Sequence, residues 1–448
     1  MRQSHITDLF RLGLLGMSVC GSLLSSAAVL NYSSNNFIAR TNNSFNSGAP
    51  SVSGGASTSF SLNGTLPSGL IFNTKTGVIS GTPNALMPPA SFTVTAQNAR
   101  GSNSTSITLT SVNGTKSLPL QGRVTLVSGF TSLAVQNAID SASSGGTVYF
   151  PTGIYEITTT LNLKGLIQYH GEYGAILHSS SENTIARAIG SQVAGISLDG
   201  LTFDGGNLVL KGDTTSFSNN VTMINCNVRN VNSTQFTLSH GVMLDHIANS
   251  KFDYNYFTNS GSGPIAYALI SYTSNHTSYS HNTIYNSHQG LHFESADVTG
   301  GNFLTVSHNT ISGIDGIGIE FNRNGSNLDI QYNYLSNWRS GDPNGMALSI
   351  VPTGSVNTIK NNYASAVGCT TCNIGLEANG SNSNFENNEI HGFFNSIAIS
   401  CAPGTIFQNN SISQFGKYGP FMRDGGYCSG YAIGRNIING ASVTGYRL

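Results

Sequence analysis

Charged side chains are scarce in this chain. Its 448 residues include 19 Lys and Arg and 20 Asp and Glu, or 9% of the chain, against about 25% in an average soluble domain. The basic residues form no runs, which argues against binding to nucleic acid. The formal net charge of -1 attracts no particular partner at long range. Any charged site must therefore be built locally, from the few charges that the fold brings together.

Long hydrophobic runs are also missing after the first 30 residues. At the N-terminus, Arg2 and Arg11 precede an apolar run over 12–24, and a Ser-Ala-Ala triplet follows at 26–28. This order resembles a secretory signal peptide, expected to span residues 1–28, and predicts a secreted or cell-surface protein. A buried N-terminal helix is the alternative. No other apolar run reaches the roughly 18 residues that a membrane span needs.

Cysteine is rare, with six in the whole chain. Cys226 is expected to be a buried free thiol. Cys369 and Cys372, two residues apart, form with Cys401 and Cys428 a set that fits either disulfides or a four-thiolate zinc site. The lack of a second Cys-x-x-Cys pair and the predicted secretion favour disulfides, whose pairing the sequence leaves open.

Glycine, serine, threonine and asparagine take the place of the missing charge. Between residues 49 and 113, short alternating segments separated by Gly and Pro predict a small Ig-like β-sandwich. Residues 29–48 are rich in Asn and Ser and are interpreted as a linker. The run LPSGLIFNTKTGVISGTP followed by SFTVTAQNARG resembles the putative-Ig family of bacterial Ig-like domains. That resemblance implies a spacer or adhesion module and supplies no catalytic residue.

A six-residue pattern, apolar-x-x-Asn-x-apolar, repeats through the last two thirds of the chain. The spacing of 22 to 29 residues, with alternation inside each unit, predicts a solenoid of parallel strands. Asn suits this position because it tolerates a left-handed backbone bend, and because Asn side chains in successive turns can hydrogen-bond along the stack. Cys226 occupies the slot in one earlier unit and Leu201 in another. The repeated residues are Asn255, Asn282, Asn309, Asn333, Asn362, Asn388 and Asn410.

An amphipathic helix is predicted at 131–143, because Val135, Ala138, Ile139 and Ala142 share one face. The run AVQNAIDSASSGGTVYFPTGIYEI resembles the opening of the pectate-lyase-like family. The resemblance implies an all-β domain over 114–448: a right-handed parallel β-helix of about ten coils, with the helix as its N-terminal cap. That family includes lyases, polygalacturonases, epimerases and phage tailspikes, so the resemblance selects no reaction.

The acidic residues concentrate at one outward strand position. The predicted column contains Asp245, Glu294, Glu320, Ser349, Glu377 and Ser400. Glu294 and Glu320 are expected to be first neighbours, with carboxylates about 5 Å apart. Such closeness would raise one pKa and give the acid and base of glycoside hydrolysis. The same acids suit Ca²⁺, or are simply solvated.

Six further residues are predicted to bind substrate: Asp245, His292, Arg323, Trp338, Arg339 and Glu377. Trp338 is the only tryptophan, and we expect it either to offer a flat face to a sugar or to pack under its own loop. His281 and His308 are interpreted as stacked turn residues rather than ligands.

These observations predict a secreted enzyme that cleaves glycosidic bonds of a polysaccharide with a carboxylate pair. The alternatives are a Ca-dependent polysaccharide lyase or epimerase, and a non-catalytic surface adhesin or glycan-binding protein. The motifs of polygalacturonases and mannuronan epimerases are missing from the sequence, and basic residues that would neutralise an acidic polymer are few.

Overall fold

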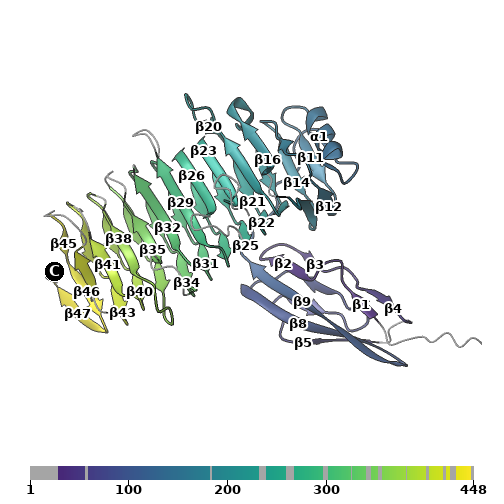
Figure 1. Ribbon diagram of the computed structural model, residues 1–448, viewed down its shortest axis with the longest axis horizontal. Coiled ribbons are helices and arrows are strands. Elements are labelled where there is room, and N and C mark those ends of the chain that lie inside the picture. Colours follow the sequence, from purple (N-terminus) through teal and green to yellow (C-terminus); the bar gives the residue numbers. More distant parts are fainter. Residues whose placement is uncertain are drawn as a thin grey trace, which may run out of the picture.

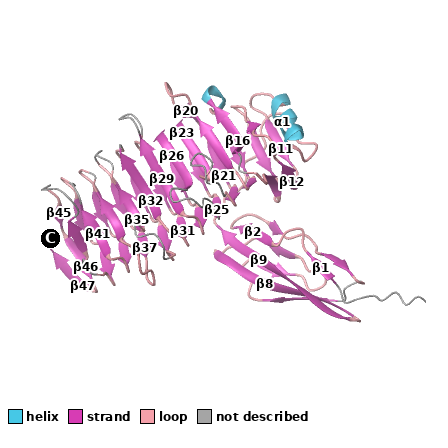
Figure 2. Cartoon of the chain, in the orientation of Figure 1, coloured by secondary structure: helices cyan, strands magenta, loops and turns pink. Residues whose placement is uncertain are grey.

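The structure is a computed structural model with two β-rich domains (Figures 1 and 2). The described residues are 29–55, 59–181, 184–231, 239–258, 267–295, 301–323, 325–339, 345–351, 356–379, 381–399, 403–416, 420–423 and 430–444. The predicted signal peptide lies outside them, as do Ser400, Cys401 and Cys428. Among the described residues, no helix has the length and apolar character to cross a membrane.

The N-terminal domain is a sandwich of three small sheets. Their orders are β1-β4, β2-β9-β8-β5 and β3-β7-β6. The strands are β1 (Val29–Asn31), β2 (Asn36–Arg40), β3 (Phe45–Asn46), β4 (Ser51–Ser53), β5 (Ser59–Asn63), β6 (Leu70–Phe72), β7 (Ile79–Gly81), β8 (Met87–Asn98) and β9 (Gly101–Val112).

The interpretation of residues 29–48 as a linker is wrong. Strand β2 pairs with β9, and β3 pairs with β7, while Phe37 and Phe45 are buried in the core of the sandwich. The segment escaped notice because its buried apolar residues are few and stand among Asn and Ser, with Val29 exposed beside the buried Leu30.

The C-terminal domain is a parallel β-helix of about ten turns, as predicted, in which every turn contributes to three long sheets. Sheet I contains β10 (Val124–Leu126), β11 (Thr147–Phe150), β14 (Gln168–Gly171), β17 (Ser197–Asp199), β21 (Thr222–Ile224), β24 (Lys251–Asp253), β27 (Ser278–Ser280), β30 (Thr305–Ser307), β33 (Asp329–Gln331), β36 (Thr358–Lys360), β39 (Asn384–Glu386), β42 (Ile406–Gln408) and β45 (Ala432–Ile433).

Sheet II contains β12 (Gly153–Glu156), β15 (Ala175–His178), β18 (Thr202–Asp204), β22 (Asn227–Arg229), β25 (Tyr256–Thr258), β28 (Thr283–Tyr285), β31 (Thr310–Ser312), β34 (Tyr334–Ser336), β37 (Tyr363–Ser365), β40 (Glu389–His391), β43 (Ser411–Ser413), β46 (Arg435–Ile438) and β47 (Ala441–Thr444). Neighbours in this order are parallel, except for the final hairpin of β46 and β47.

Sheet III contains β13 (Leu161–Asn162), β16 (Thr184–Ile189), β19 (Asn207–Lys211), β23 (Val242–Ala248), β26 (Tyr267–Asn275), β29 (Gln289–Ser295), β32 (Ile317–Arg323), β35 (Met346–Ile350), β38 (Ile374–Ala378), β41 (Asn395–Ile399) and β44 (Phe421–Arg423), with β20 (Ser218–Asn219) paired to β23. The single α-helix of the described chain, α1 (Ser132–Ser141), covers the first turn, and Thr131 caps its N-terminus. This confirms the predicted cap.

The predicted repeat describes the core closely. All seven apolar residues that precede the Asn slot are fully buried, and so are the seven that follow it. Rings in this core stack from turn to turn, as Phe252 does on Tyr279, with ring centroids 5.4 Å apart.

The repeated Asn residues form a continuous ladder between sheets I and II. Each side-chain oxygen accepts from the backbone N–H at the ladder position of the preceding turn, and each amide donates to a sheet I carbonyl of that turn. For Asn309 the partners are the Asn282 N–H at 2.9 Å and the Tyr279 carbonyl at 2.8 Å. The predicted bonding along the column is therefore confirmed, and an eighth member, Asn436, extends it.

The ladder residues themselves do not carry the left-handed bend. That conformation belongs to the residue just before each of the seven predicted ladder residues, for example His281 (φ +58°) and His308 (φ +56°). Their rings stack outside the corner, with centroids 4.8 Å apart, which confirms their interpretation as stacked turn residues. The ladder Asn is selected for its amide, which satisfies backbone groups that would otherwise be buried without partners.

The earliest turns lack the ladder, and the connection between the domains takes its place. Backbone N–H groups of residues 113–121, which we call the strap, donate to buried side chains of sheet I. Thr115 donates to Asn225 (3.0 Å), Leu118 to Asp199 (2.8 Å) and Gln121 to Thr147 (2.9 Å). Cys226 fills its slot as a buried free thiol, as predicted.

Arg40 of the sandwich forms hydrogen bonds with the β-helix. Its guanidinium donates to the backbone carbonyls of Tyr254 at 2.7 Å and Cys226 at 2.9 Å, and it also contacts the side chain of Asn227. Burial lowers the pKa of Arg40 to about 10, so the group stays charged at neutral pH. Figure 1 shows the sandwich lying beside the first half of the β-helix.

Candidate functional site

Six of the predicted site residues lie on sheet III: Asp245, His292, Glu294, Glu320, Arg323 and Glu377. The column differs from the prediction at two steps, between Glu294 and Glu320 and again after Glu377. Glu294 pairs with Asn322, and His292 pairs with Glu320. The expectation that Glu294 and Glu320 are first neighbours is therefore wrong. The register is displaced by two residues between β29 and β32 because Phe293 stacks on Phe321 in the core, with ring centroids 4.6 Å apart.

The two glutamates are joined through His292 instead. His292 Nδ1 lies 2.7 Å from Glu320 Oε2, and Nε2 lies 3.4 Å from Glu294 Oε2. The imidazole is 4% exposed, so it is almost completely covered while both carboxylates reach the surface. We call these three residues the acid-histidine cluster.

Two more groups hold the carboxylates from the outside. Arg323 Nε lies 2.9 Å from Glu294 Oε1, and the Tyr267 hydroxyl donates to Glu320 Oε2 at 2.9 Å. The Tyr267 ring also packs on the imidazole of His292, with centroids 4.4 Å apart. The structure thus places Arg323 beside the predicted pair, and adds a tyrosine that the sequence analysis did not identify.

The protonation of the cluster follows from these contacts. Burial alone lowers the pKa of the His292 imidazole, but its hydrogen bonds to Glu294 and Glu320 outweigh burial and raise that pKa above the ordinary 6.5. The hydrogen bond from His292, supported by Arg323, lowers the pKa of Glu294 despite partial burial. The raised carboxyl pKa expected from two adjacent like charges is therefore not found at Glu294, because a cation separates the two acids.

Asp245 belongs to the second outward row of the same face. Its register partner is Tyr272, and Tyr272 pairs in turn with Glu294. Asp245 Oδ1 lies 2.6 Å from His246 Nδ1, and Oδ2 lies 3.6 Å from Lys211 Nζ. Burial, followed by the charges of Glu294 and Asp245, raises the pKa of Tyr272 to about 12. This row presents a neutral hydroxyl between two carboxylates.

Glu377 continues the first row, two turns beyond Glu320. Ser349 pairs with both of them, and its hydroxyl donates to Glu377 Oε2 at 2.6 Å. The next row member is Ala398, which occupies the place expected for Ser400. The polar surface therefore ends near β38.

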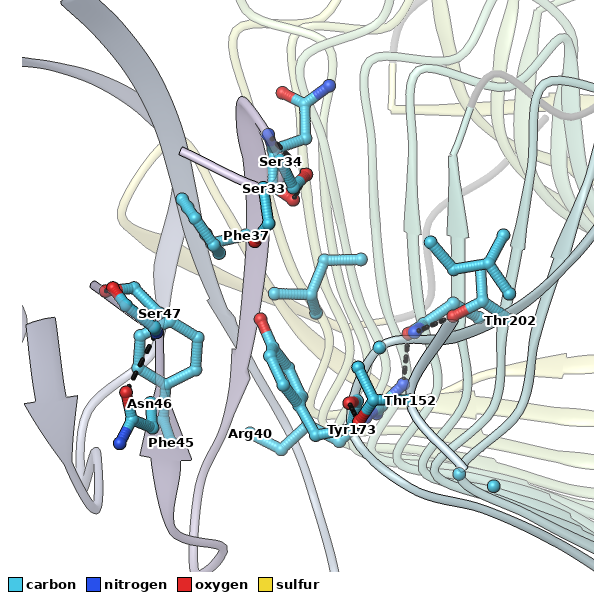
Figure 3. Close-up of a pocket in the computed structure, with 18 of the residues that line it drawn as sticks. Ser33, Ser34, Phe37, Arg40, Phe45, Asn46, Ser47, Thr152, Tyr173 and Thr202 are labelled. Atoms are coloured by element: carbon cyan, nitrogen blue, oxygen red, sulfur yellow. Dashed lines mark hydrogen bonds between the residues drawn. The ribbon is translucent and has the colours of Figure 1, made fainter. Parts of the chain in front are cut away.

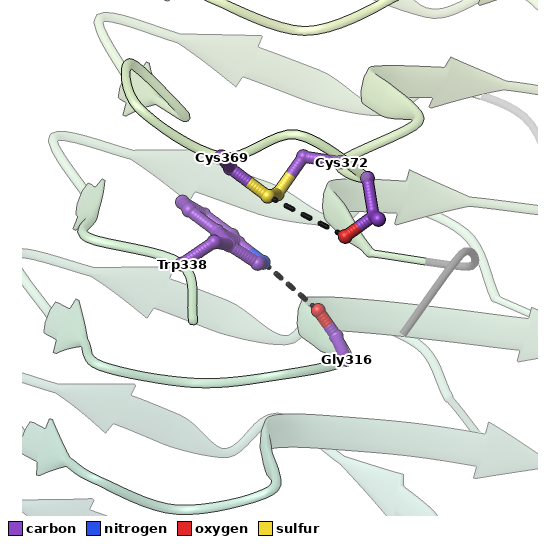
Figure 4. Close-up of a disulfide and its surroundings, with 5 residues drawn as sticks. Gly316, Trp338, Cys369 and Cys372 are labelled. Carbon is purple, nitrogen blue, oxygen red and sulfur yellow. Dashed lines mark hydrogen bonds between the residues drawn. A yellow bond between two sulfur atoms is a disulfide. The ribbon is translucent and has the colours of Figure 1, made fainter. Parts of the chain in front are cut away.

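Trp338 is not available to a sugar. It is 6% exposed, donates from Nε1 to the Gly316 carbonyl at 2.9 Å, and packs against Phe393. Figure 4 shows it beneath the Cys369–Cys372 disulfide. The sugar-platform hypothesis is wrong. Trp338 is buried, as the alternative expected, but its partners come from other turns and not from its own loop.

Arg339 points toward a different part of the molecule. Its guanidinium lies 2.9 Å from Asp315 Oδ2 and 2.6 Å from Asn286 Oδ1, at the turn that leads from sheet II into sheet III. Glu294 lies near the opposite end of its strand. The structure thus gives no support to Arg339 as a substrate-binding residue of the acid-histidine cluster.

The cysteines and acids were also considered as metal ligands. Cys369 and Cys372 form a disulfide, which removes two of the four thiolates of the zinc hypothesis. Across the residues that the structure describes, no group of three or more His, Cys, Asp or Glu is arranged to hold a metal ion. Glu294 and Glu320 face the two nitrogens of His292 from opposite sides instead of converging on one point.

Sequence reasoning missed Tyr267 and Tyr272 because the turn that contains them was ambiguous. Tyr267 begins β26, whose central residues Leu269, Ile270 and Ser271 are all buried, so alternation gave no clear inward and outward sets. The pairing of β26 with β29 places Tyr272 opposite Glu294, an acid that the sequence had already singled out. Tyr267 lies opposite Gln289 and reaches Glu320 only through its hydroxyl.

Comparisons with known proteins support the two-domain description. Residues 25–112 match the family model described as "Putative Ig domain". A search of curated proteins finds no match to the chain. The resemblance of the β-helix to the pectate-lyase-like family stays a prediction.

Solved structures show distant likeness to the chain. The catalytic domain of Agl-KA is 15% identical, covers 92% of this chain and 82% of its own, and gives a TM-score of 0.46. PfbA, a surface adhesin of Streptococcus pneumoniae, is 14% identical over 70% of this chain and 90% of its own (TM-score 0.45). Endo-xylogalacturonan hydrolase from Aspergillus tubingensis is 12% identical over 69% and 95% (TM-score 0.42). These likenesses are too distant to select a reaction or a ligand.

Proposed function

We propose that the sheet III face binds a neutral polysaccharide and hydrolyses its glycosidic bonds, with Glu294 and Glu320 as the catalytic carboxyl groups. The observation that carries this proposal is the placement of the two acids on opposite sides of the buried His292 imidazole. This placement gives the two acids unequal surroundings, and acid-base catalysis requires two carboxyl groups in different protonation states.

The contacts support a different role for each glutamate in this proposal. Glu294 is the ionised member, because His292 and Arg323 both stabilise its negative charge. In the hydrolytic step it accepts a proton from the attacking water. Glu320 shares the proton on His292 Nδ1 across 2.7 Å, and it delivers that proton to the glycosidic oxygen as the leaving sugar departs.

The geometry also predicts the stereochemistry. The imidazole lies between the two contacting oxygens, 2.7 Å from one and 3.4 Å from the other. Carboxyl groups with a ring between them fit the roughly 6.5–9.5 Å separation of inverting enzymes better than the roughly 5.5 Å of retaining ones. Glu294 therefore activates water rather than attacking the sugar itself. The first product formed should have the inverted anomeric configuration.

The charge of the face favours a neutral substrate. Glu294, Glu320 and Asp245 are acidic, and the nearby cations Arg323 and Lys211 are already engaged with two of them. A polymer of uronic acids would meet repulsion without a cation to neutralise its carboxylates. A neutral glycan can instead donate its hydroxyl groups to the exposed carboxylate oxygens.

The test is a screen of neutral and acidic polysaccharides with chromatographic and NMR analysis of products. The expected result is cleavage of a neutral polymer with inversion, and loss of that cleavage in both Glu294→Gln and Glu320→Gln. Unchanged turnover in both variants would exclude the pair as the catalyst. Unsaturated, ultraviolet-absorbing ends that vanish with a chelator would instead identify a metal-dependent lyase.

A second candidate is glycan binding without cleavage. It is favoured by the position of the His292 ring, which fills part of the space between the carboxylates that an attacking water would need. In that case the wild-type protein would retain a glycan without releasing any product, and Glu294→Gln would reduce retention only modestly.

A further inference from the structure

A cleft lies between the sandwich and the β-helix, far along the chain from the acid-histidine cluster. Its volume is about 720 Å³, inside the roughly 300–1,000 Å³ range of sites for small ligands. Figure 3 shows Ser33, Phe37 and Ser47 of the sandwich on one side, and Thr152 and Thr202 of the β-helix on the other, with Tyr173 standing between them. We call it the interdomain cleft.

The floor of the interdomain cleft is one row of register partners on sheet II. Ile154 pairs with Ile176, Ile176 with Thr202, and Thr202 with Asn227. Ile154 is 53% exposed, so the row begins with an open apolar surface. It ends with a hydrogen bond from the Asn227 amide to the Thr202 hydroxyl at 2.9 Å.

Tyr173 supplies an aromatic wall. Its ring meets Phe45 of the sandwich edge to face, with centroids 5.4 Å apart, while 48% of the residue stays exposed to solvent. The Tyr173 hydroxyl is hydrogen-bonded to the Ile38 backbone, so the ring is held in place while about half of the residue stays exposed. A rigid aromatic ring placed in this way is suited to stack on the apolar face of a sugar.

The walls are fixed before any ligand arrives. Arg40 anchors the sandwich through the carbonyls of Cys226 and Tyr254, and the strap bonds the connecting chain to sheet I through Asp199 and Asn225. Because both domains are held by buried polar contacts, ligand binding would not have to order a mobile sandwich, and this preorganisation favours affinity.

The two arginines that line the interdomain cleft are already engaged in hydrogen bonds. Arg229 is paired with Asp204 at 3.2 Å, and Arg40 is committed to the contacts above. The remaining polar lining consists of hydroxyl and amide groups such as Ser34, Asn36 and Thr152. Such groups recognise the hydroxyls of an uncharged ligand, and they add no charge that would favour a phosphate or a carboxylate over it.

We infer that the interdomain cleft is a second, non-catalytic binding site for a neutral oligosaccharide, with Tyr173 as the stacking residue and the Ile154–Ile176 pair as the apolar floor. This inference does not rest on hydrolysis at sheet III. It gives the sandwich a role as one wall of a carbohydrate site in addition to that of a spacer.

The test measures binding of neutral hexasaccharides by isothermal titration calorimetry, with cello-, xylo-, manno-, malto- and laminarihexaose as probes. The protein is the Glu294→Gln/Glu320→Gln double variant, so that cleavage at sheet III cannot confuse the result. The expected outcome is binding of at least one probe, weakened at least tenfold by Tyr173→Ala and less than threefold by Tyr173→Phe, which keeps the ring.

Thermal melting and circular dichroism verify that each variant is folded, and Ile154→Ser serves as a second variant that leaves the Phe45 contact intact. It should weaken binding about three- to tenfold. If no probe binds the folded protein, or if binding is unaffected by both Tyr173→Ala and Ile154→Ser, the interdomain cleft is not a sugar site. Either result leaves the proposal for sheet III untouched, because that proposal is judged by product formation in the wild type.

Discussion

Two columns of polar side chains run along the β-helix, and they have opposite characters. The ladder between sheets I and II is made of a single residue type, is uncharged and buried, and each Asn bonds in the same way to the next turn. The column on sheet III mixes His292, Glu320, Ser349 and Glu377, is partly exposed, and makes a different contact at every turn. The regular column stabilises the stacking of the turns, whereas the varied side chains of the irregular column can form a binding or catalytic site.

The largest effect is expected on the irregular column, where two acids of one row can be compared. Glu320→Gln should lower kcat by about 10²- to 10⁴-fold, the usual range for loss of a general acid. Glu377→Gln should lower it by less than about tenfold, because Glu377 contacts Ser349 and not His292. Steady-state kinetics on a cleaved polysaccharide measure both variants. Equal losses would mean that position along the row, and not contact with His292, decides function.

The next effect concerns the regular column. Asn309→Ala removes the acceptor of the Asn282 N–H and the donor to the Tyr279 carbonyl, and each buried group left without a partner costs about 1–3 kcal/mol. We expect the free energy of unfolding to fall by about 2–4 kcal/mol, measured by urea denaturation.

The matched control is Asn137→Ala, on the exposed face of α1. This change should alter the free energy of unfolding by less than about 0.5 kcal/mol, in the stabilising direction, because Ala is the better helix former. If Asn309→Ala lowered the free energy of unfolding as little as the control does, the backbone groups at this corner would find other partners without the ladder.

A smaller effect is the pH dependence of the melting temperature, which should have opposite signs for His292 of the sheet III column and for His281, which stacks on His308 outside the ladder. The pKa of His292 is raised above 6.5, so its contribution is complete below about pH 6.5 and is lost as the pH rises through the folded value. The pKa of His281 is lowered, by burial and then by His308, so its contribution is present above pH 6.5 and is lost on acidification.

Melting curves between pH 5 and pH 9 test this difference. Compared with wild type, His292→Gln should melt less pH-dependently above pH 6.5, and His281→Asn less pH-dependently below it, by about 1–3 °C in each case. Asn suits position 281 because that backbone is left-handed. Parallel curves for wild type and both variants would contradict the prediction.

The smallest effect is expected at the junction of the ladder with the strapped turns. The backbone N–H of Cys226 already donates the ladder hydrogen bond, to the side-chain oxygen of Asn255 at 3.1 Å. Cys226→Asn would extend the ladder by one turn, and the new hydrogen bonds should roughly balance the cost of burying an amide. The free energy of unfolding should change by less than about 1 kcal/mol. A fall in the free energy of unfolding of more than about 2 kcal/mol would show that the bend at Cys226, in the turns bound by the strap, differs in shape from the bends that carry the Asn ladder.

The sequence predicted the bend between sheets I and II well, because the same physical requirement recurs there at every turn. Buried backbone groups need a partner, and the same amide supplies it, so Asn309 and its relatives repeat visibly. The site on sheet III was predicted only in part. A displacement by two residues preserves the alternation of inward and outward side chains, so the pattern could not distinguish Glu294 beside Glu320 from His292 beside Glu320.

The stacking of Phe293 on Phe321 decided that choice, and such packing is not readable from alternation. The prediction that Trp338 binds a sugar was wrong for a related reason. The sequence places Trp338 in a connection between strands, but it cannot show that the disulfide and Phe393 cover the ring. The segment at 29–48 was misjudged because a strand with only two or three inward residues resembles a linker.

The strap has a consequence for how the two domains could be recombined. A cut between residues 113 and 121 would separate the sequences of the sandwich and the β-helix. It would also remove the backbone N–H donors that hydrogen-bond to the buried side chains of Asp199 and Asn225. The β-helix is therefore not a free-standing cassette to be joined to any other module. Exchange of the sandwich for another domain should succeed only when the native connection travels with the β-helix.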